Sequence, residues 1–598
     1  MPIKYSVNFD DVNKHLFNVK VEIPKHQESI LNLSLPAWIP GSYMIRDFSK
    51  NIINLNVTNK SNNLTINLID KQNWSIQTNG ASCTVEYQVY AFDSSVRTAY
   101  LDKNRAFFNG TSLFLSVKEF KNEKHIVNLI KPSFSESWKV ATGLQRASKT
   151  PVYSFGEYFS DDYAELIDCP VEIGDFTHLE FEVAGTPHYL ILNGKHYADT
   201  DRLVKDTTKL CQHHIDLFEK DTGGKPPFDE YWFLTNILPS GFGGLEHKNS
   251  TALLCSTFDF PNINKPEELS DGYKTLLSLI SHEYFHNWNV CRIKPEEFVP
   301  YSLNNESYTK QLWAYEGITS YYDDFSLFRT GIVSFEDYLK LKGKTISRVN
   351  RGNGQLKQNL IESSFYTWTK FYQQGADAAN NIVSYYTKGS LVALWLDLTI
   401  RKATNASKSL DDVMRVLWAE FINKGADYKG TQLDTIINIV NELISSDVTA
   451  EFYQLLNDKS PVPLTELLAD FGVELKQVPS KAASLLEVSS EEHSPYLGFM
   501  FTESALGITV TQVLENSPVE QAGISVQDNI IAIDNIVVSK GNFSDVVNNL
   551  ELEKNYIISC VRNGELLSSD IQVSTPVNEL SQLVLVEERK TRDWMNII

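Results

Sequence analysis

Residues 278–295, SLISHEYFHNWNVCRIKP, place two histidines four residues apart, with a glutamate directly after the first. The residues just before the first histidine keep a helical apolar pattern, with Leu276 and Ile280 on the side expected to face the interior. On a helix, the spacing i, i+4 puts His282 and His286 on one face. This stretch therefore predicts a helix that presents two imidazole rings side by side.

Glu283, which follows the first histidine, completes a pattern suited to a catalytic metal site. Neutral imidazoles bind zinc well, and a catalytic zinc site takes three protein ligands and leaves a position open for water. Glu283 can accept a proton from that water, which makes it the candidate general base. A surface helix with two solvated histidines is the alternative interpretation.

A candidate third ligand, Glu316, lies further along the chain in the segment QLWAYEGITSYYDDF. A carboxylate among Trp313, Tyr315 and Tyr321 is costly to bury unless it is paired or bound to a metal. The predicted ligand set is then two imidazoles and one carboxylate around a single zinc ion. A capping or salt-bridged glutamate is the alternative.

Composition and charge narrow the function classes. A chain of 598 residues is too long for one core, so we expect about two to four domains. The formal charge of −21 and a pI near 5.1 argue against a nucleic acid as ligand, because the phosphate backbone needs a basic surface. The amino terminus lacks the pattern of an export signal, and no stretch is apolar enough to span a membrane. Six scattered cysteines without a CxxC pair suit a reducing compartment, so the expected location is cytoplasmic.

Five segments follow from the periodicity, and together they predict a multidomain α+β fold. Residues 1–175 alternate like strands and predict an antiparallel β domain. From 176 to 478 helical patterns dominate, with one strand pair near YWFLTNILPSGFGGLEHKNSTALLC, so we expect a small sheet and a helical bundle. The chain is serine- and charge-rich at 478–494, as in a linker, and a compact β-rich unit follows at 490–577. Residues 578–598 are expected to form a tail.

The last β-rich unit resembles a PDZ domain, on the residues SPYLGFMF and GITVTQVLENSPVEQAGISVQDNIIAIDNIVV. Ser517 can cap a short helix that Pro518 starts and Gly523 ends, and Asn563-Gly564 can close a hairpin. A PDZ domain binds a peptide as an added strand, often with the peptide carboxylate held by the loop before that strand. The resemblance assigns three residues to this loop, Leu497, Gly498 and Phe499. A purely structural module is the alternative.

Nearly the whole chain resembles the glycyl aminopeptidases of metallopeptidase family 61, in the gluzincin group, which shares a thermolysin-like catalytic core. The resemblance rests on HEYFHNWN, WAYEGITSYY and GGLEH, and on two amino-terminal segments, LPAWIPGSYMIRDFSKNI at 35–52 and FFNGTSLF at 107–114. It implies that His282, His286 and Glu316 hold the zinc ion. It also implies that residues 176–478 contain the thermolysin-like core.

The segment GFGGLEH is similar to the substrate-binding strand of gluzincin aminopeptidases. Gly243 and Gly244 would let a substrate backbone approach closely, where side chains would prevent it. By resemblance, Glu246 holds the free amino group of the substrate. GGLEH departs from the GAMEN form of the related aminopeptidases, which leaves the role of His247 open. A glycine bulge with an exposed glutamate is the alternative.

The segment SYYTKGSLVALWLDL resembles the gluzincin Tyr-x-Lys-Gly segment, whose tyrosine donates a hydrogen bond to the oxyanion. A phenol near zinc can stabilise developing negative charge. The matching position is Tyr386, with its neighbour Tyr385 as the rival. A buried tyrosine with only a structural role is the alternative.

The leading hypothesis is a zinc aminopeptidase that removes small residues, glycine or alanine first, from peptides with a free amino terminus. The preference for glycine comes only from the resemblance. One alternative is a gluzincin endopeptidase in which Glu246 binds no amine and the PDZ domain recruits longer substrates. Another is an interaction protein that binds a peptide or protein in its PDZ groove and has an inactive metal site.

Overall fold

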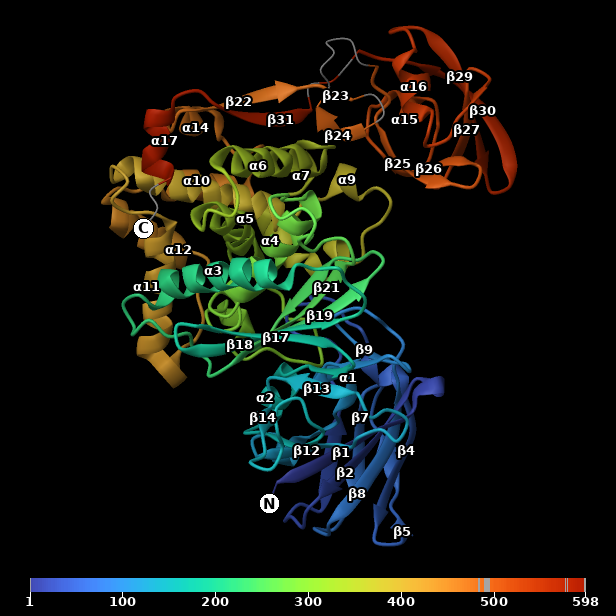
Figure 1. The fold of residues 1–598 in the computed structure, drawn as a ribbon, viewed down its shortest axis with the longest axis vertical. Helices are drawn as coiled ribbons and strands as arrows, with labels where there is room; N and C mark the ends of the chain where they lie inside the picture. Colours follow the sequence, from blue (N-terminus) through green and yellow to red (C-terminus); the bar gives the residue numbers. More distant parts are fainter. Residues whose placement is uncertain (1, 482–483, 489–494, 576, 578, 596–598) are drawn as a thin grey trace. The chain divides into compact units, whose positions relative to one another are not determined.

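The computed structural model describes residues 2–481, 484–488, 495–575, 577 and 579–595. The chain forms two compact units, Met1–Ser307 with Glu420–Gly430, and Tyr308–Ala419 with Thr431–Ile598. Both units contain sheets as well as helices (Figure 1), so the predicted multidomain α+β class is confirmed. Among the described residues, no helix combines the length and the apolar character that crossing a membrane requires.

The first unit begins with a β domain built around an eight-stranded sheet. Its strand order is β14 (Gln145–Arg146), β15 (Gly156–Ser160), β12 (His125–Leu129), β1 (Ile3–Asp11), β2 (Leu16–Ile23), β8 (Cys83–Tyr90), β4 (Ile52–Asn59) and β5 (Asn62–Asn63). Along most of β1 every second residue is buried, as the alternating sequence predicts. The strand pairs of this sheet are antiparallel, as expected, except that β1 runs parallel to β12.

A five-stranded sheet follows in the same unit. Its order is β17 (Thr177–Val183), β18 (Thr186–Asn193), β19 (Tyr231–Leu238), β21 (Ser250–Ser256) and β20 (Gly243–Glu246). The sequence predicts one strand pair in the region of β19–β21, but this region contains three strands. β19 and β21 run parallel, and β20 pairs antiparallel with the other side of β21. β19 is buried along nearly its whole length, which explains its continuous apolar run. β20 is therefore an edge strand of this sheet.

Two helices pack with the five-stranded sheet, α3 (Thr200–Glu219) and α4 (Asp271–Phe285). α3 contacts β17, and α4 contacts both β20 and β21. α4 is the helix that the histidine stretch predicts. The side chain of Ser270 accepts a hydrogen bond from the backbone N–H of Tyr273 and caps the start of α4. Leu276 and Ile280 are buried, as predicted.

The second unit contains the predicted helical bundle. α10 (Thr387–Ala403) is buried along most of its length and packs against α5 (Ile318–Arg329) and α6 (Phe335–Asn350). Tyr321 of α5 donates a hydrogen bond to Asp397 of α10 at 2.7 Å, and Arg401 pairs with the same carboxylate at 2.8 Å. The bond from Tyr321 ties α5 to α10, because separating the helices would cost the buried carboxylate of Asp397 one of its hydrogen bonds, while its ion pair with Arg401 lies within α10.

The second unit also contains a small β domain with its own apolar core. Its sheet has the order β25 (Phe499–Ser504), β26 (Gly507–Val513), β27 (Asn529–Ile533), β29 (Asn555–Arg562) and β30 (Glu565–Gln572). Ser517 caps α15 (Pro518–Gln521), and Pro518 is the first residue of the helix, as predicted. The predicted turn at Asn563-Gly564 joins β29 to β30.

The small β domain is inserted between two strands that pair with each other. β22 (Val473–Val478) precedes the domain, β31 (Leu580–Leu585) follows it, and the two strands are antiparallel neighbours. β24 (Ser484–Val488) occupies part of the predicted linker at 478–494. The linker residues 482–483 and 489–494 lie outside the described residues.

The segment after the small domain packs onto the helical bundle, which differs from the tail expected at 578–598. The backbone N–H of Ser581 in β31 donates to the hydroxyl of Ser347 in α6, at 2.8 Å. α17 (Glu588–Met595) follows, and its Trp594 is fully buried, with the ring centroid 5.8 Å from that of Tyr338. Sequence periodicity misses these elements because both are short and their partners are distant in the sequence.

We expect truncation after Val478 to unfold the helical bundle, because it removes β31 and α17. Replacing residues 479–579 by a short hairpin turn should leave the bundle folded, since Val478 and Leu580 are opposite each other in the strand pair. In the full-length protein, Trp594→Ala should cost about 3 to 5 kcal/mol of unfolding free energy.

Urea denaturation followed by circular dichroism measures these effects. The hairpin-closed deletion is the matched control for the truncation, because both lack the small β domain. Equal unfolding midpoints for the two deletions would contradict the structural role of β31 and α17.

Candidate metal centre

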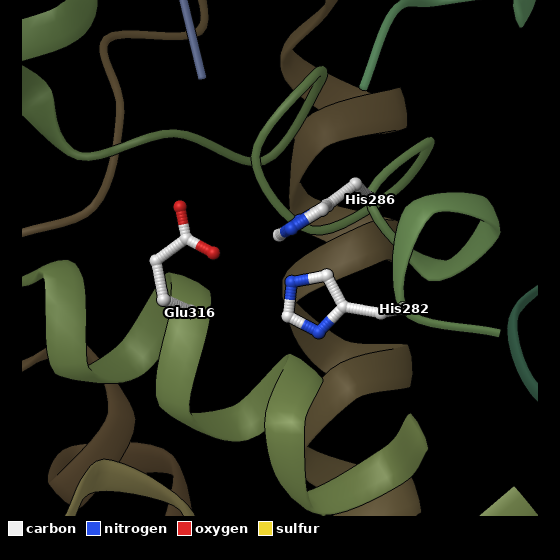
Figure 2. A group of neighbouring side chains, drawn as sticks. All are labelled: His282, His286 and Glu316. Atoms are coloured by element: carbon white, nitrogen blue, oxygen red, sulfur yellow. The ribbon is translucent and has the colours of Figure 1, made fainter. Parts of the chain in front are cut away.

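Figure 2 shows His282, His286 and Glu316 directed at one another. One ligand atom from each residue lies within 4.8 Å of the other two. His282 is in the last turn of α4 and His286 directly follows that helix, with their ring centroids 4.6 Å apart. Glu316 belongs to η5 (Trp313–Gly317), a π-helical turn before α5. The structure thus brings together the three residues that the sequence predicts as ligands.

A backbone carbonyl orients the ring of His286. Nδ1 of His286 lies 2.7 Å from the carbonyl oxygen of Asn289, and since a carbonyl only accepts, Nδ1 carries the proton. Nε2 is then unprotonated and available as a metal ligand, an arrangement typical of metal-binding histidines. Sequence reasoning misses Asn289. The only signal is its place just after the second histidine, in HNWN.

Glu316 is only 2% exposed, and the π-helical turn determines where it lies. Such turns insert an extra residue into a helix and occur often at functional sites. A Cβ atom on the next residue, Gly317, would lie 2.6 Å from the backbone of Gly389, so glycine is needed for this close contact. The contact sets η5 against the start of α10, whose N-cap residue is Tyr386.

Strand β20 lies directly against the candidate base. A Cβ atom on Gly244 would lie 1.8 Å from Oε1 of Glu283, so a side chain at this position would displace the carboxylate. A Cβ atom on Gly243 would meet Arg97 instead, at an ordinary contact distance of 3.6 Å. Of the two predicted glycines, Gly244 is therefore the one that keeps Glu283 in place.

Glu246 lies beside the same group of side chains. One ligand atom each from Glu246, Glu283 and His286 lies within 4.8 Å of the others, and Glu246 is 8% exposed. A Cβ atom on Gly41 would lie 2.4 Å from Oε2 of Glu246, so the segment WIPGSY of the amino-terminal domain reaches this carboxylate. Sequence reasoning misses this contact, and its only signal is the Pro40-Gly41 pair, which marks a turn.

His247, whose role the sequence leaves open, forms a buried pair. It is 2% exposed, and its Nδ1 lies 3.1 Å from Oδ1 of Asp168. Burial acts to raise the pKa of Asp168, but the interactions with His247 and Lys248 together lower this pKa overall. Both residues line a cavity of about 730 Å³ that also borders Glu246. The pairing gives His247 a structural role in the wall of this cavity.

The two neighbouring tyrosines have different environments. Tyr385 is fully buried, its hydroxyl accepts a hydrogen bond from Thr367 at 2.9 Å, and burial raises its pKa far above the ordinary value. Tyr386 is half-buried at the start of α10. Of the two phenols, Tyr386 is therefore the more accessible.

The predicted peptide-carboxylate loop of the small β domain precedes strand β25. Leu497 and Phe499 direct their side chains into the core of the domain, at 2% and 5% exposure. Gly498, between them, accepts a hydrogen bond at its carbonyl from the backbone N–H of Leu514, at 2.9 Å. β25 is an edge strand of its sheet, so a peptide strand could be added beside it.

Comparison with known families gives three matches. The peptidase M61 N-terminal domain matches residues 4–175, and the M61 glycyl aminopeptidase matches residues 275–392. A PDZ domain matches residues 495–573, which confirms the predicted PDZ domain. A comparison with curated protein sequences found no match.

Two solved structures illustrate the similarity. The crystal structure of an aminopeptidase N family protein from Idiomarina loihiensis matches with a TM-score of 0.94 and 42% identity, covering 99% of this chain and 100% of that chain. The crystal structure of an M1 zinc metallopeptidase from Deinococcus radiodurans matches with a TM-score of 0.46 and 11% identity, covering 77% of this chain and 94% of that chain.

The two overlapping clusters predict different effects on metal binding. Glu316→Ala should weaken zinc binding by more than about a hundredfold. Loss of a residue that only orients a metal ligand can cost up to about a hundredfold in metal affinity, and loss of the ligand itself should cost more. Glu246→Ala is the matched control and should retain zinc, because Glu246 is predicted to bind the substrate amine. Competition with a chelator measures both affinities. Loss of zinc from Glu246→Ala but not from Glu316→Ala would show that the cluster of Glu246, Glu283 and His286 holds the metal.

Proposed function

The chain belongs to the M61 glycyl aminopeptidase family, and we propose that it is a zinc aminopeptidase that acts on peptides with a free amino terminus. Family membership makes the chain a metallopeptidase. Zinc as the metal, action at the first peptide bond and a preference for glycine or alanine are the proposed parts. The observation that carries the proposal is the cluster of His282, His286 and Glu316.

The donor set fits one zinc ion per chain. Two imidazoles and a carboxylate are a common set for catalytic zinc, and they leave a coordination position for water. The bond from His286 to the carbonyl of Asn289 leaves Nε2 as the metal-binding atom. When bound, zinc would polarise the scissile carbonyl and make the attacking water more acidic.

Glu283 acts as the general base in this proposal. Its carboxylate takes a proton from the attacking water and then transfers that proton to the leaving amine. Its nearness to the backbone of Gly244 supports the role, because a peptide bound along the edge of β20 would bring its scissile bond to this carboxylate.

Glu246 binds the substrate amino group in this proposal. A carboxylate near the base can pair with a protonated amine and thereby determine which peptide bond reaches Glu283. Such a pair is worth about 1.5 to 3 kcal/mol when it is withdrawn from water. The contact with Gly41 supports this role, because it restricts the position of the carboxylate.

Tyr386 donates a hydrogen bond to the oxyanion that develops on the scissile carbonyl. One observation supports Tyr386 over Tyr385: the hydroxyl of Tyr385 is buried and bonded to Thr367, whereas Tyr386 is half-buried at the start of α10. The donor acts mainly in the transition state, so it should affect kcat more than KM.

The endopeptidase alternative has one observation in its favour. The edge strand β25 of the PDZ domain could bind part of a long peptide substrate. A substrate of two or three residues is too short to bind there and at the metal site together. The role of Glu246 separates the two alternatives. The cytoplasmic location and the ligand of the PDZ groove stay predictions.

Glu283→Gln should keep about one zinc per chain and lose about a thousandfold or more in kcat, because the ligands remain while proton transfer is lost. Zinc content is measured by metal analysis, and kcat on a panel of fluorogenic aminoacyl substrates with and without chelator. Near-normal turnover with full zinc content would rule out Glu283 as the base.

Free glycyl or alanyl peptides should be cleaved at least about a hundredfold better than their acetylated forms, because acetylation removes the charge that Glu246 binds. Glu246→Ala should remove most of this difference by losing activity on free amines, with normal zinc content. Values of kcat/KM for matched free and acetylated peptides test both points. Efficient internal cleavage of acetylated peptides by the unmodified protein would favour the endopeptidase.

A further inference from the structure

We propose that Asn380 is a positioning residue that ties the PDZ domain to the segment leading into Tyr386. The seated PDZ domain then helps to determine where the oxyanion-binding hydroxyl lies, and it is part of the catalytic apparatus as well as a peptide-binding module. This inference rests on the role of Tyr386 in the proposed function. It concerns only the second unit, which contains both the PDZ domain and Tyr386.

The side chain of Asn380 makes two hydrogen bonds to the PDZ backbone. Its Nδ2 donates to the carbonyl of Val513 at 2.9 Å, and its Oδ1 accepts from the N–H of Glu515 at 3.0 Å. Both partners lie at the end of β26, on either side of Leu514. The amide of Asn380 therefore uses its donor and its acceptor on one turn of the PDZ domain, an arrangement that fixes orientation as well as distance.

Charged and apolar contacts also join the PDZ domain to the helical bundle around Asn380. Glu515 accepts a hydrogen bond from Asn353 at 2.7 Å and pairs with Lys357 at 2.8 Å. Ala379, next to Asn380, packs against an apolar cluster that includes Tyr496 and Leu514 of the PDZ domain. The PDZ domain is thus seated on the helical bundle through several kinds of interaction around Asn380.

The helix that carries Asn380 is too short to hold its position alone. α9 (Ala378–Asn381) is four residues long, and none of them is buried. An isolated helix of this length is unstable, so its position depends on its contacts. These contacts come from two sides: the backbone of Gly352 and Gly354 lies close to Ala379 and Ile382, and Asn380 and Ala379 contact the PDZ domain. Loss of the Asn380 side chain would therefore remove one of the two supports that position α9.

The segment between α9 and Tyr386 is short and tightly held. The backbone N–H of Val383 donates to Oε1 of Gln358 at 2.9 Å, and the Val383 carbonyl accepts from the hydroxyl of Ser363. The hydroxyl of Ser384 accepts from the backbone N–H of Tyr386 at 3.2 Å. Displacement of α9 would therefore strain bonds that position Tyr386, because the intervening residues have few ways to absorb the shift.

A double-mutant cycle tests the inference in the full-length chain. Asn380→Ala should lower kcat about tenfold on a small glycyl anilide with little change in KM, since small misplacements of reacting groups can cost up to about a hundredfold. Zinc content and the thermal midpoint should stay close to normal. In the Tyr386→Phe background the same substitution should have almost no further effect, because Asn380 acts through the missing hydroxyl.

Asn381→Ala is the matched control. Asn381 lies in the same helix, and its side chain bonds to Asp377 and to Lys357, which itself pairs with Glu515. None of these three bonds goes to the PDZ backbone, in contrast to the bonds of Asn380. This variant should keep normal kcat. A merely structural role of Asn380 would lower the thermal midpoint or the amount of active enzyme and would persist in the Tyr386→Phe background.

The outcomes separate this inference from the proposed function. If Tyr386→Phe lowers kcat but Asn380→Ala does not, or if the two losses multiply, the positioning role is overturned and the proposed function stands. If Tyr386→Phe leaves kcat unchanged, the oxyanion assignment and the positioning role both fail. If the unmodified protein cleaves no aminoacyl substrate, the proposed function itself fails.

Discussion

A concentration of buried charge is the constraint on which the catalytic architecture depends. Three buried carboxylates surround His286, and their exposed fractions are 2% for Glu316, 4% for Glu283 and 8% for Glu246. Collecting carboxylates in a poorly hydrated place is unfavourable, because each negative charge opposes the ionisation of its neighbours. A divalent cation removes this conflict, so metal binding and the folded arrangement should stabilise each other.

Bare backbone, rather than side-chain packing, allows the elements of the site to approach one another. β20 reaches Glu283 at Gly244, and the Glu316 segment reaches α10 at Gly317. At both places the two parts meet at distances that any side chain would increase. The residues proposed to perform the chemistry therefore depend on glycines that supply no functional side chain of their own.

Sequence patterns predict the parts of this protein that depend on local chemistry. The helix of the two histidines, its buried Leu276 and Ile280, and the cap at Ser517 all follow from spacing and from residue types close in the chain. The ligand candidates come from the same patterns, because a buried carboxylate and paired imidazoles are unusual in any context. Domain similarity adds the PDZ fold.

Contacts between distant segments could not be predicted in this way. Gly41 and Glu246 meet through the tertiary fold, and neither position carries a periodic signal. The carbonyl of Asn289 orients His286 through its backbone, which any residue type could do. The pairing of β31 with β22 depends on the return of the chain after an entire domain, so the final segment is expected to be a tail when only periodicity is considered.

The place of the PDZ domain between β22 and β31 also sets the order in which the protein can be completed on the ribosome. The PDZ domain has its own core, so it can fold as soon as it is synthesised. The bundle must wait longer, because Ser347 of α6 bonds to a residue 234 positions later in the chain. The helical bundle, which contains Glu316 and Tyr386, therefore completes its fold after the PDZ domain, and a nascent chain would carry a folded PDZ domain before it could assemble a complete peptidase.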